Sequence, residues 1–229
     1  MKLITKSIAC MAAFSLALAR PLNAEMILSQ VIVDFLPNSP SRNDIEVYNS
    51  GDERMYIAVE PTEVVNPGLP NEQTVSASDP NASGILVSPR KLVLEPGERR
   101  IVRIAMVDDR PSKDRVYRVA IKPVAGPISA NRSALKVLVG YNVLVIYRPQ
   151  TVSGGVVGAR SGDHLELKNE SNTAQQLFDG QQCDAAGSNC VSLIERRLYP
   201  GASLDVPLQY STPAHYKVSA GDKTTDQVF

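Results

Sequence analysis

The 229-residue sequence has no tryptophan, only two histidines and only three cysteines. The chain therefore has few residues from which a histidine or cysteine metal site could be built. Lysine and arginine total 24, as do aspartate and glutamate, so the formal net charge is zero. A protein that binds nucleic acid through its phosphates usually carries an excess of basic residues, so this composition does not suggest a nucleic-acid partner.

The two histidines do not suggest catalysis. His164 follows a Gly-Asp turn and His215 follows a proline, and neither has a placed nucleophile or an orienting partner nearby in the sequence. The sequence contains no His-Glu-x-x-His, Gly-x-Ser-x-Gly or phosphate-binding glycine loop. We therefore predict that the protein is not an enzyme and needs no metal ion or cofactor.

The longest apolar run is at the start of the chain, and no later segment is long and apolar enough to anchor it in a membrane. Lys2 and Lys6 precede an apolar stretch at residues 8–19, and Leu-Asn-Ala at residues 22–24 resembles a cleavage site. The run is too short to span a bilayer, so residues 1–24 are interpreted as a secretory signal peptide. A buried N-terminal helix is the alternative. We expect an exported product without membrane insertion.

Removal of the signal peptide would leave two cysteines, Cys183 and Cys190. An even pair in an oxidising compartment favours a disulfide. Zinc binding is disfavoured because no nearby cysteine or histidine completes a set of four ligands. The bridge would close a short loop, so its stabilising effect should lie at the low end of the usual range.

Short strands bounded by turn residues recur along the chain, whereas helical periodicity is hard to find. Roughly seven strands up to Pro149 have the spacing of an immunoglobulin-like sandwich. Residues 151–158 look like a linker to a second, smaller β unit. We predict an all-β protein with two sandwich domains, at residues 25–149 and 150–229.

Three segments carry more specific expectations. Residues 26–35 are apolar and are predicted to form one strand. Residues 67–84 are rich in proline, glycine, serine and asparagine, which indicates an exposed loop. Residues 216–229 are polar and sparsely apolar, so no ordered element is predicted there.

The most informative segment is the long run at residues 135–149, which is rich in β-branched residues and ends at a proline. One alternating face offers apolar side chains, namely Leu135, Val137, Val139 and Tyr141. A strand with such a face can pair with a foreign chain, which points to binding of other proteins. An ordinary core strand is the alternative.

Several motifs occur in an order that resembles the periplasmic chaperones of the chaperone–usher pilus pathway. The resemblance covers essentially the whole chain after the signal peptide, and no single motif decides it. The matching pieces are Pro89, Leu94-Glu95-Pro96-Gly97, Tyr147-Arg148-Pro149, Leu165-x-Leu167-x-Asn169 and Tyr199-Pro200-Gly201.

The resemblance implies two immunoglobulin-like domains arranged as a boomerang in the periplasm. Such a chaperone binds pilus subunits by lending its long strand to their incomplete sheet, and delivers them to an outer-membrane usher. The donated side chains here would be Leu135, Val137 and Val139, with Tyr141 as a weaker fourth. Self-association of the unloaded protein is left open. The alternative function is a structural subunit or adhesin of a surface fibre.

One feature departs from the pattern. The resemblance implies a basic pair that holds the subunit's terminal carboxylate, but Ile32 and Leu144 occupy the corresponding positions. Arg90 and Lys91 are the candidate substitutes, because a carboxylate favours charge-assisted partners. A solvated turn is the alternative for these two residues. The departure suggests a divergent branch, such as the archaic-type chaperones.

The resemblance also assigns a structural role to Arg148. The equivalent arginine lies between the domains in a charge network that fixes their angle. Asp114 and Asp222 are its expected acidic partners, because a buried arginine without a partner would be costly.

Overall fold

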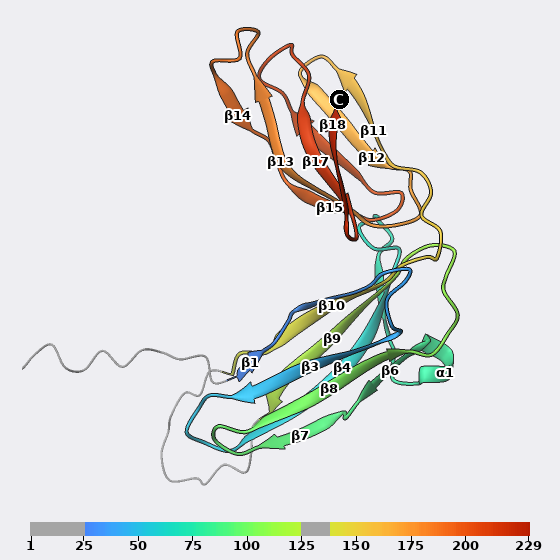
Figure 1. Ribbon diagram of the computed structural model, residues 1–229, viewed down its shortest axis with the longest axis vertical. Helices are drawn as coiled ribbons and strands as arrows, with labels where there is room; N and C mark the ends of the chain where they lie inside the picture. The colour runs from blue at the N-terminus through green and yellow to red at the C-terminus, as the bar shows by residue number, and fades with distance from the viewer. Residues whose placement is uncertain (1–25, 125–137) are drawn as a thin grey trace, which may run out of the picture.

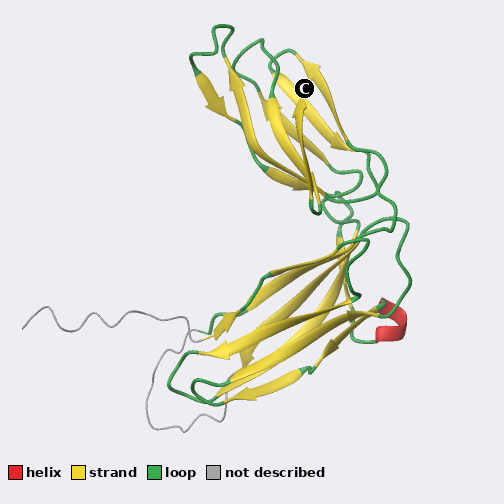
Figure 2. Cartoon of the chain, in the orientation of Figure 1, coloured by secondary structure: helices red, strands yellow, loops and turns green. Residues whose placement is uncertain are grey.

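The computed structural model describes residues 26–124 and 138–229. Almost all regular structure in these ranges is β-strand, and one short helix, α1 (Pro80–Ser83), lies at the side of the first domain (Figure 2). Two β domains are set end to end at an angle (Figure 1). Domain 1 contains β1 to β10, and domain 2 contains β11 to β18.

Domain 1 is a sandwich of two sheets. One sheet has the strand order β1-β3-β8-β6, and the other has the order β2-β10-β9-β4-β5, with β7 also paired to β4. The strands are β1 (Met26–Leu28), β2 (Ile32–Phe35), β3 (Arg42–Asn49), β4 (Met55–Val65), β5 (Gln73–Ser76), β6 (Ile85–Ser88), β7 (Lys91–Leu94), β8 (Arg99–Met106), β9 (Arg115–Val124) and β10 (Tyr141–Tyr147).

Domain 2 repeats this plan on a smaller scale. Its sheets have the orders β11-β12-β16 and β14-β13-β17-β18, with β15 also paired to β13. The strands are β11 (Val156–Ser161), β12 (His164–Asn169), β13 (Gln175–Cys183), β14 (Cys190–Ser192), β15 (Arg196–Leu198), β16 (Ser203–Pro207), β17 (His215–Ala220) and β18 (Lys223–Val228).

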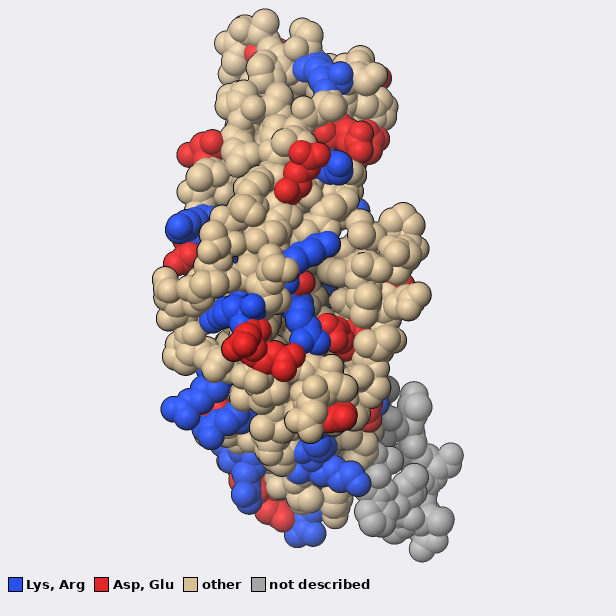
Figure 3. Space-filling view, turned by 90° about the vertical axis from the view of Figure 1, so that its right-hand side faces the viewer, with Lys and Arg blue, Asp and Glu red and all other residues tan. Residues whose placement is uncertain are grey.

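Alternation of apolar and polar residues places the core of each sandwich. In β8, Val102 and Ile104 are fully buried, whereas Ile101 and Arg103 on the other face are exposed. The two sheets of domain 1 bury one continuous apolar cluster, and those of domain 2 bury another. Acidic and basic side chains are interspersed on the face of the molecule drawn in Figure 3, in keeping with the zero net charge.

Residues 26–35 form two strands in different sheets, so the prediction of one strand was wrong. β1 pairs with β3, whereas β2 pairs in parallel with β10 in the opposite sheet. The burial pattern changes phase between them: Met26 is buried at an even position, and Val33 and Phe35 are buried at odd positions. An apolar run predicts that a strand faces a core, but it does not predict which sheet the strand joins.

The segment at residues 67–84 is more structured than an exposed loop, which corrects the second expectation. It contains β5 and α1. The Asp79 side chain caps the helix by accepting a hydrogen bond from the backbone N–H of Asn81, and Gly84 ends it with a left-handed φ of 67°.

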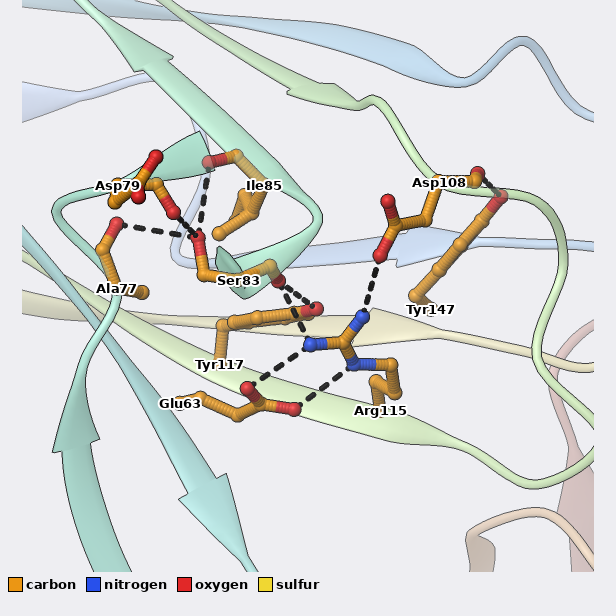
Figure 4. A network of polar contacts seen from close by, with 9 residues as sticks. All are labelled: Glu63, Ala77, Asp79, Ser83, Ile85, Asp108, Arg115, Tyr117 and Tyr147. Atoms are coloured by element: carbon orange, nitrogen blue, oxygen red, sulfur yellow. Dashed lines mark hydrogen bonds and ion pairs between the residues drawn. The ribbon is translucent and has the colours of Figure 1, made fainter. Parts of the chain in front are cut away.

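A polar network attaches α1 to the sheet (Figure 4). Both the Arg115 guanidinium and the Tyr117 hydroxyl donate to the backbone oxygen of Ser83, each at 2.8 Å. Arg115 also pairs with Glu63 on β4, with Nε 2.9 Å from Oε1, and with Asp108. Burial raises the pKa of Tyr117 above its usual range, so the hydroxyl remains a donor. The polar residues of this segment therefore form a short helix that is hydrogen-bonded to the sandwich.

The C-terminal segment is also ordered, contrary to expectation. It forms most of β17 and all of β18. Tyr216 and Val218 alternate into the core, and the rings of Tyr216 and Phe229 meet edge to face with centroids 6.2 Å apart. The sequence of β18 is polar because β18 is an edge strand with mostly exposed side chains.

The disulfide between Cys183 and Cys190 is confirmed. The two residues are register partners at the ends of β13 and β14, and their sequence separation is 7. The bridge closes the tip of this hairpin, so it constrains a short loop.

Replacing both cysteines by alanine should lower the free energy of unfolding by about 2 kcal/mol, because closing so short a loop removes little chain entropy. Urea unfolding of the wild type with and without a reductant would check this value. The double variant is the control, since the reductant should leave its midpoint unchanged. A wild-type midpoint that does not respond to the reductant would contradict the expectation.

Candidate functional site

The N-terminal half of β10 has an open edge. β10 pairs with β9 along its whole length, but it pairs with β2 only from Leu144 to Tyr147. The backbone N–H of Leu144 donates to the oxygen of Val31 at 3.0 Å. Because backbone groups alternate between the two sides of a strand, the N–H and C=O of Asn142 point to the same side. Across residues 26–124 and 138–229, no strand pairs with them there.

Two of the four predicted donor residues, Leu135 and Val137, lie outside the described residues. Val139 is 62% exposed, and it lies two residues before the start of β10. Tyr141 is half-buried, packs against the domain 1 core and donates its hydroxyl to the backbone oxygen of Met26 at 3.0 Å. At the open edge, Val139 is therefore available to a partner, whereas Tyr141 already contributes to the core.

The face of the β2–β10–β9–β4 sheet that points away from the core is called the outer face here. Leu144 lies between Ile32 on β2 and Arg118 on β9, and Arg118 lies between Leu144 and Thr62. The two positions that lack the expected basic pair are thus direct neighbours. The cation Arg118 lies next to Leu144, on β9.

Arg118 was not recognised in the sequence. It is half-buried, and its guanidinium forms no hydrogen bond or ion pair with any residue of the described ranges. Lys122, further along the same face, is paired with Glu60 at 2.8 Å. The alternation of β9 could have identified Arg118 as an outward side chain, because Tyr117 and Val119 on either side of it are fully buried.

Arg90 and Lys91 lie elsewhere on the sheet. The Arg90 guanidinium donates to the backbone oxygen of Ser78 at 3.0 Å, which attaches it to a loop. Lys91 is an exposed partner of Ala58 on β4. β4 and β9 separate both residues from β10 and β2, so the structure does not bring them to Leu144.

Arg148 joins the two domains. The residue is only 5% exposed, and its guanidinium donates to both carboxylate oxygens of Asp34, with Nε 2.6 Å from Oδ1. Its third nitrogen donates to Thr173 Oγ1 at 2.6 Å and to the Ala174 oxygen at 3.0 Å. The carboxylate partner, Asp34 on β2, was missed in the sequence because it lies within an apolar strand.

Asp114 belongs to the same junction, whereas Asp222 forms no hydrogen bond or ion pair with Arg148 in the described ranges. Asp114 accepts hydrogen bonds from Thr173 Oγ1 at 2.8 Å and from the backbone N–H of Ala174 at 2.6 Å. Asp222 is exposed in the turn between β17 and β18, and no bond joins it to Arg148 within the described structure. Arg148 and Asp114 therefore both bond to Thr173 and Ala174 of domain 2.

Apolar contacts reinforce this junction. Part of the outer face is buried with Ala174 and the partly buried Tyr199 of domain 2 in one cluster, to which domain 1 contributes Val64, Val116, Leu144 and Ile146. Arg118 and Ile32 lie in the same cross-strand row as Leu144, at the margin of this cluster. The outer face is thus apolar at the junction and bears the Arg118 cation at its margin.

This arrangement is suited to binding a chain. Among the residues that the structure describes, no group of three or more His, Cys, Asp or Glu side chains could hold a metal ion. In the same ranges, no helix has the length and hydropathy to cross a bilayer. The distinctive features are the open strand edge, the exposed Val139 and the half-buried Arg118.

Comparison with known proteins places the chain in a structural class. No model of a protein family matches it. A CS1 fimbrial subunit of Escherichia coli is 28% identical over 190 residues, which are 78% of this chain and 79% of that protein. The class 5 fimbriae chaperone CfaA superposes with a TM-score of 0.67 at 20% identity, over 89% of this chain and 98% of that chain.

Two further solved structures agree. The E. coli chaperone DraB has a TM-score of 0.60 at 17% identity, over 89% of this chain and 95% of that chain. The CsuC–CsuE chaperone–subunit complex from archaic Csu pili of Acinetobacter baumannii has a TM-score of 0.59 at 13% identity, over 89% and 97%. The chain therefore has the two-domain all-β fold of periplasmic pilus chaperones, and the resemblance expected from its motifs is confirmed.

Burial at the junction raises the pKa of the Asp114 carboxyl, although its hydrogen bonds from Ala174 and Thr173 and the charge of Arg148 oppose the shift. The folded protein therefore holds this proton to higher pH than the unfolded chain. As pH rises from about 4 through the raised pKa, the contribution of Asp114 to stability should fall.

The Asp114→Asn variant should lack this decline. We expect its free energy of unfolding, relative to that of the wild type, to increase as pH rises from about 4 to 7. Urea unfolding of both proteins across this range would measure the difference. Loss of a hydrogen-bond acceptor changes the free energy of unfolding of the variant by the same amount at every pH. The test therefore uses only the slope of the difference against pH. A flat or opposite slope would contradict the assignment.

Proposed function

We propose that the protein is a periplasmic, non-enzymatic chaperone that binds pilus or fimbrial subunits through the open edge of β10 and delivers them to an outer-membrane usher. The observation that supports this most directly is the edge itself, where the backbone groups of Asn142 lack a strand partner within the described ranges, next to the exposed Val139. The fold of the solved fimbrial chaperones supports the same role.

Strand addition suits this edge for a physical reason. An incoming strand would gain backbone hydrogen bonds that do not depend on its sequence, so different subunits could be accepted. Alternate side chains of the lent segment, Leu135, Val137 and Val139, would fill a groove in the subunit. An unpaired edge of this kind also favours self-association of the unloaded protein.

Replacing Val139 by glutamate should reduce subunit capture by about 10- to 150-fold, because the lost burial of one such side chain is worth about 1.5–3 kcal/mol. Co-expression with subunits encoded by neighbouring genes, followed by pull-down, would measure capture. The matched control is Val93→Glu, at a valine that is 45% exposed on β7. Equal recovery with the two variants would reject the lent-strand mechanism.

A carboxylate anchor at Arg118 is the second part of the proposal. Arg118 is half-buried, lacks a partner among the described side chains and neighbours Leu144, where the resemblance leads one to expect a basic residue. A subunit's terminal carboxylate would supply a charge-assisted, bidentate partner. Arg90 and Lys91 remain the candidates derived from the sequence, and a direct comparison can separate the three.

We expect Arg118→Met to weaken binding of a subunit's C-terminal peptide by about 1.5–3 kcal/mol, since a hydrogen bond to a charged group is lost. Calorimetric titration with the free-acid peptide would measure this, and the peptide amide is the control, for which wild type and variant should bind alike. Arg90→Met and Lys91→Met provide matched charge deletions. Weakening by either of these, with binding by Arg118→Met unchanged, would transfer the anchor to Arg90 or Lys91.

A structural subunit of a fibre is the alternative, and the E. coli relative is called a fimbrial subunit. The match to CfaA over 98% of the length of that chaperone favours the first proposal. Size-exclusion of the purified protein separates the two functions, because a fibre subunit forms polymers whereas a chaperone stays small or forms closed oligomers.

A further inference from the structure

The tip of the β4–β5 hairpin, residues 66–72, is shaped by its own bonds. Asn66 and Gly68 take left-handed φ angles of 53° and 73°. The backbone N–H of Leu69 donates to the Asn66 oxygen at 3.1 Å, and that of Glu72 donates to the Leu69 oxygen at 3.0 Å. The Glu72 carboxylate accepts from the Gly68 N–H at 2.6 Å. The tip therefore presents Leu69 in a defined position.

This tip belongs to domain 1 but contacts domain 2. Leu69 is partly buried and packs against the apolar core cluster of domain 2. A Cβ atom built on Gly68 would lie 3.3 Å from the Tyr199 ring and 3.5 Å from Cβ of Ala202. Figure 1 shows the loop above β4 reaching the base of domain 2.

The contacted segment, residues 199–202, is the turn that joins β15 to β16 and hence the two sheets of domain 2. Its backbone is bonded to β12, with the Gly201 N–H donating to the Asn169 oxygen at 2.8 Å. Leu198 just before the turn and Ala202 at its end are buried in the core of domain 2. Leu69 therefore covers the end of the domain 2 sandwich at the point where its sheets meet.

We propose that Leu69 is a positioning residue, which completes the core of domain 2 from domain 1 and fixes the angle between the domains. The covalent linker after β10 provides one connection, and Arg148, which bonds to Thr173, lies at the start of that linker. The hairpin tip provides a contact from a different part of domain 1, which opposes rotation about the junction. The link to subunit capture rests on the function proposed above.

The test uses Leu69→Asn in the full chain, with Val75→Asn as the matched control. Val75 lies on β5 of the same hairpin and is 42% exposed. Leu69→Met should behave like the wild type because it conserves volume and apolar character. In scanning calorimetry of the unloaded protein, Leu69→Asn should lower the melting midpoint of domain 2 by about 5–10 °C and separate it from that of domain 1.

Small-angle scattering of the same samples should show a wider range of interdomain arrangements for Leu69→Asn only. Melting and scattering identical to those of Val75→Asn would overturn the proposal. These two readouts need no subunit, so they hold even if the proposed function fails. With a subunit that the wild type captures, Leu69→Asn should reduce capture several-fold, and unchanged capture by the uncoupled variant would overturn the positioning role.

Discussion

The arrangement of the domains depends on the hydrogen bonds of the buried Arg148 guanidinium. A buried charge must be paired, and removal of its partners would cost several kcal/mol. Arg148 finds its carboxylate on β2, at Asp34, and its remaining acceptors on Thr173 and Ala174 of domain 2. The same charge therefore holds the parallel strand β2 against β10 and holds domain 2 against the end of domain 1. Asp114 completes the junction by accepting a hydrogen bond from the Thr173 hydroxyl.

This junction divides the outer face of the sheet into two parts. Leu144 and Ile146 are buried with the residues of domain 2, whereas Ile32, in the same row as Leu144, is 47% exposed. Arg118 is half-buried at the margin between the parts. A half-buried cation is only partly hydrated. An anion that binds at the margin would therefore compensate for the lost hydration. The exposed Ile32 and the charge of Arg118 in the same row are the features that the proposed carboxylate anchor would use.

Much of the fold follows from the sequence, because alternation and turn residues specify strands locally. The two sandwich domains belong to this class, whereas the disulfide was predicted from an even pair of cysteines and the interdomain position of Arg148 from the family resemblance. The partners could not be predicted in the same way. Asp34 sits in an apolar strand and Arg118 in a strand of mixed character, and their roles depend on the register between strands distant in sequence. Leu69 lies in a segment whose composition indicates a loop, and its burial depends on the other domain.

The break within residues 26–35 accounts for the open edge. β1 is paired in the sheet opposite β10, and the chain changes sheets before β2 begins. β2 can therefore cover β10 only from Leu144 onward, and the backbone of Asn142 is left without a strand partner in the described structure. One uninterrupted strand beside β10 would have closed the sheet. The phase change between Met26 and Val33 thus leaves an incomplete ladder, and this is the edge that the proposed binding of a second chain would use.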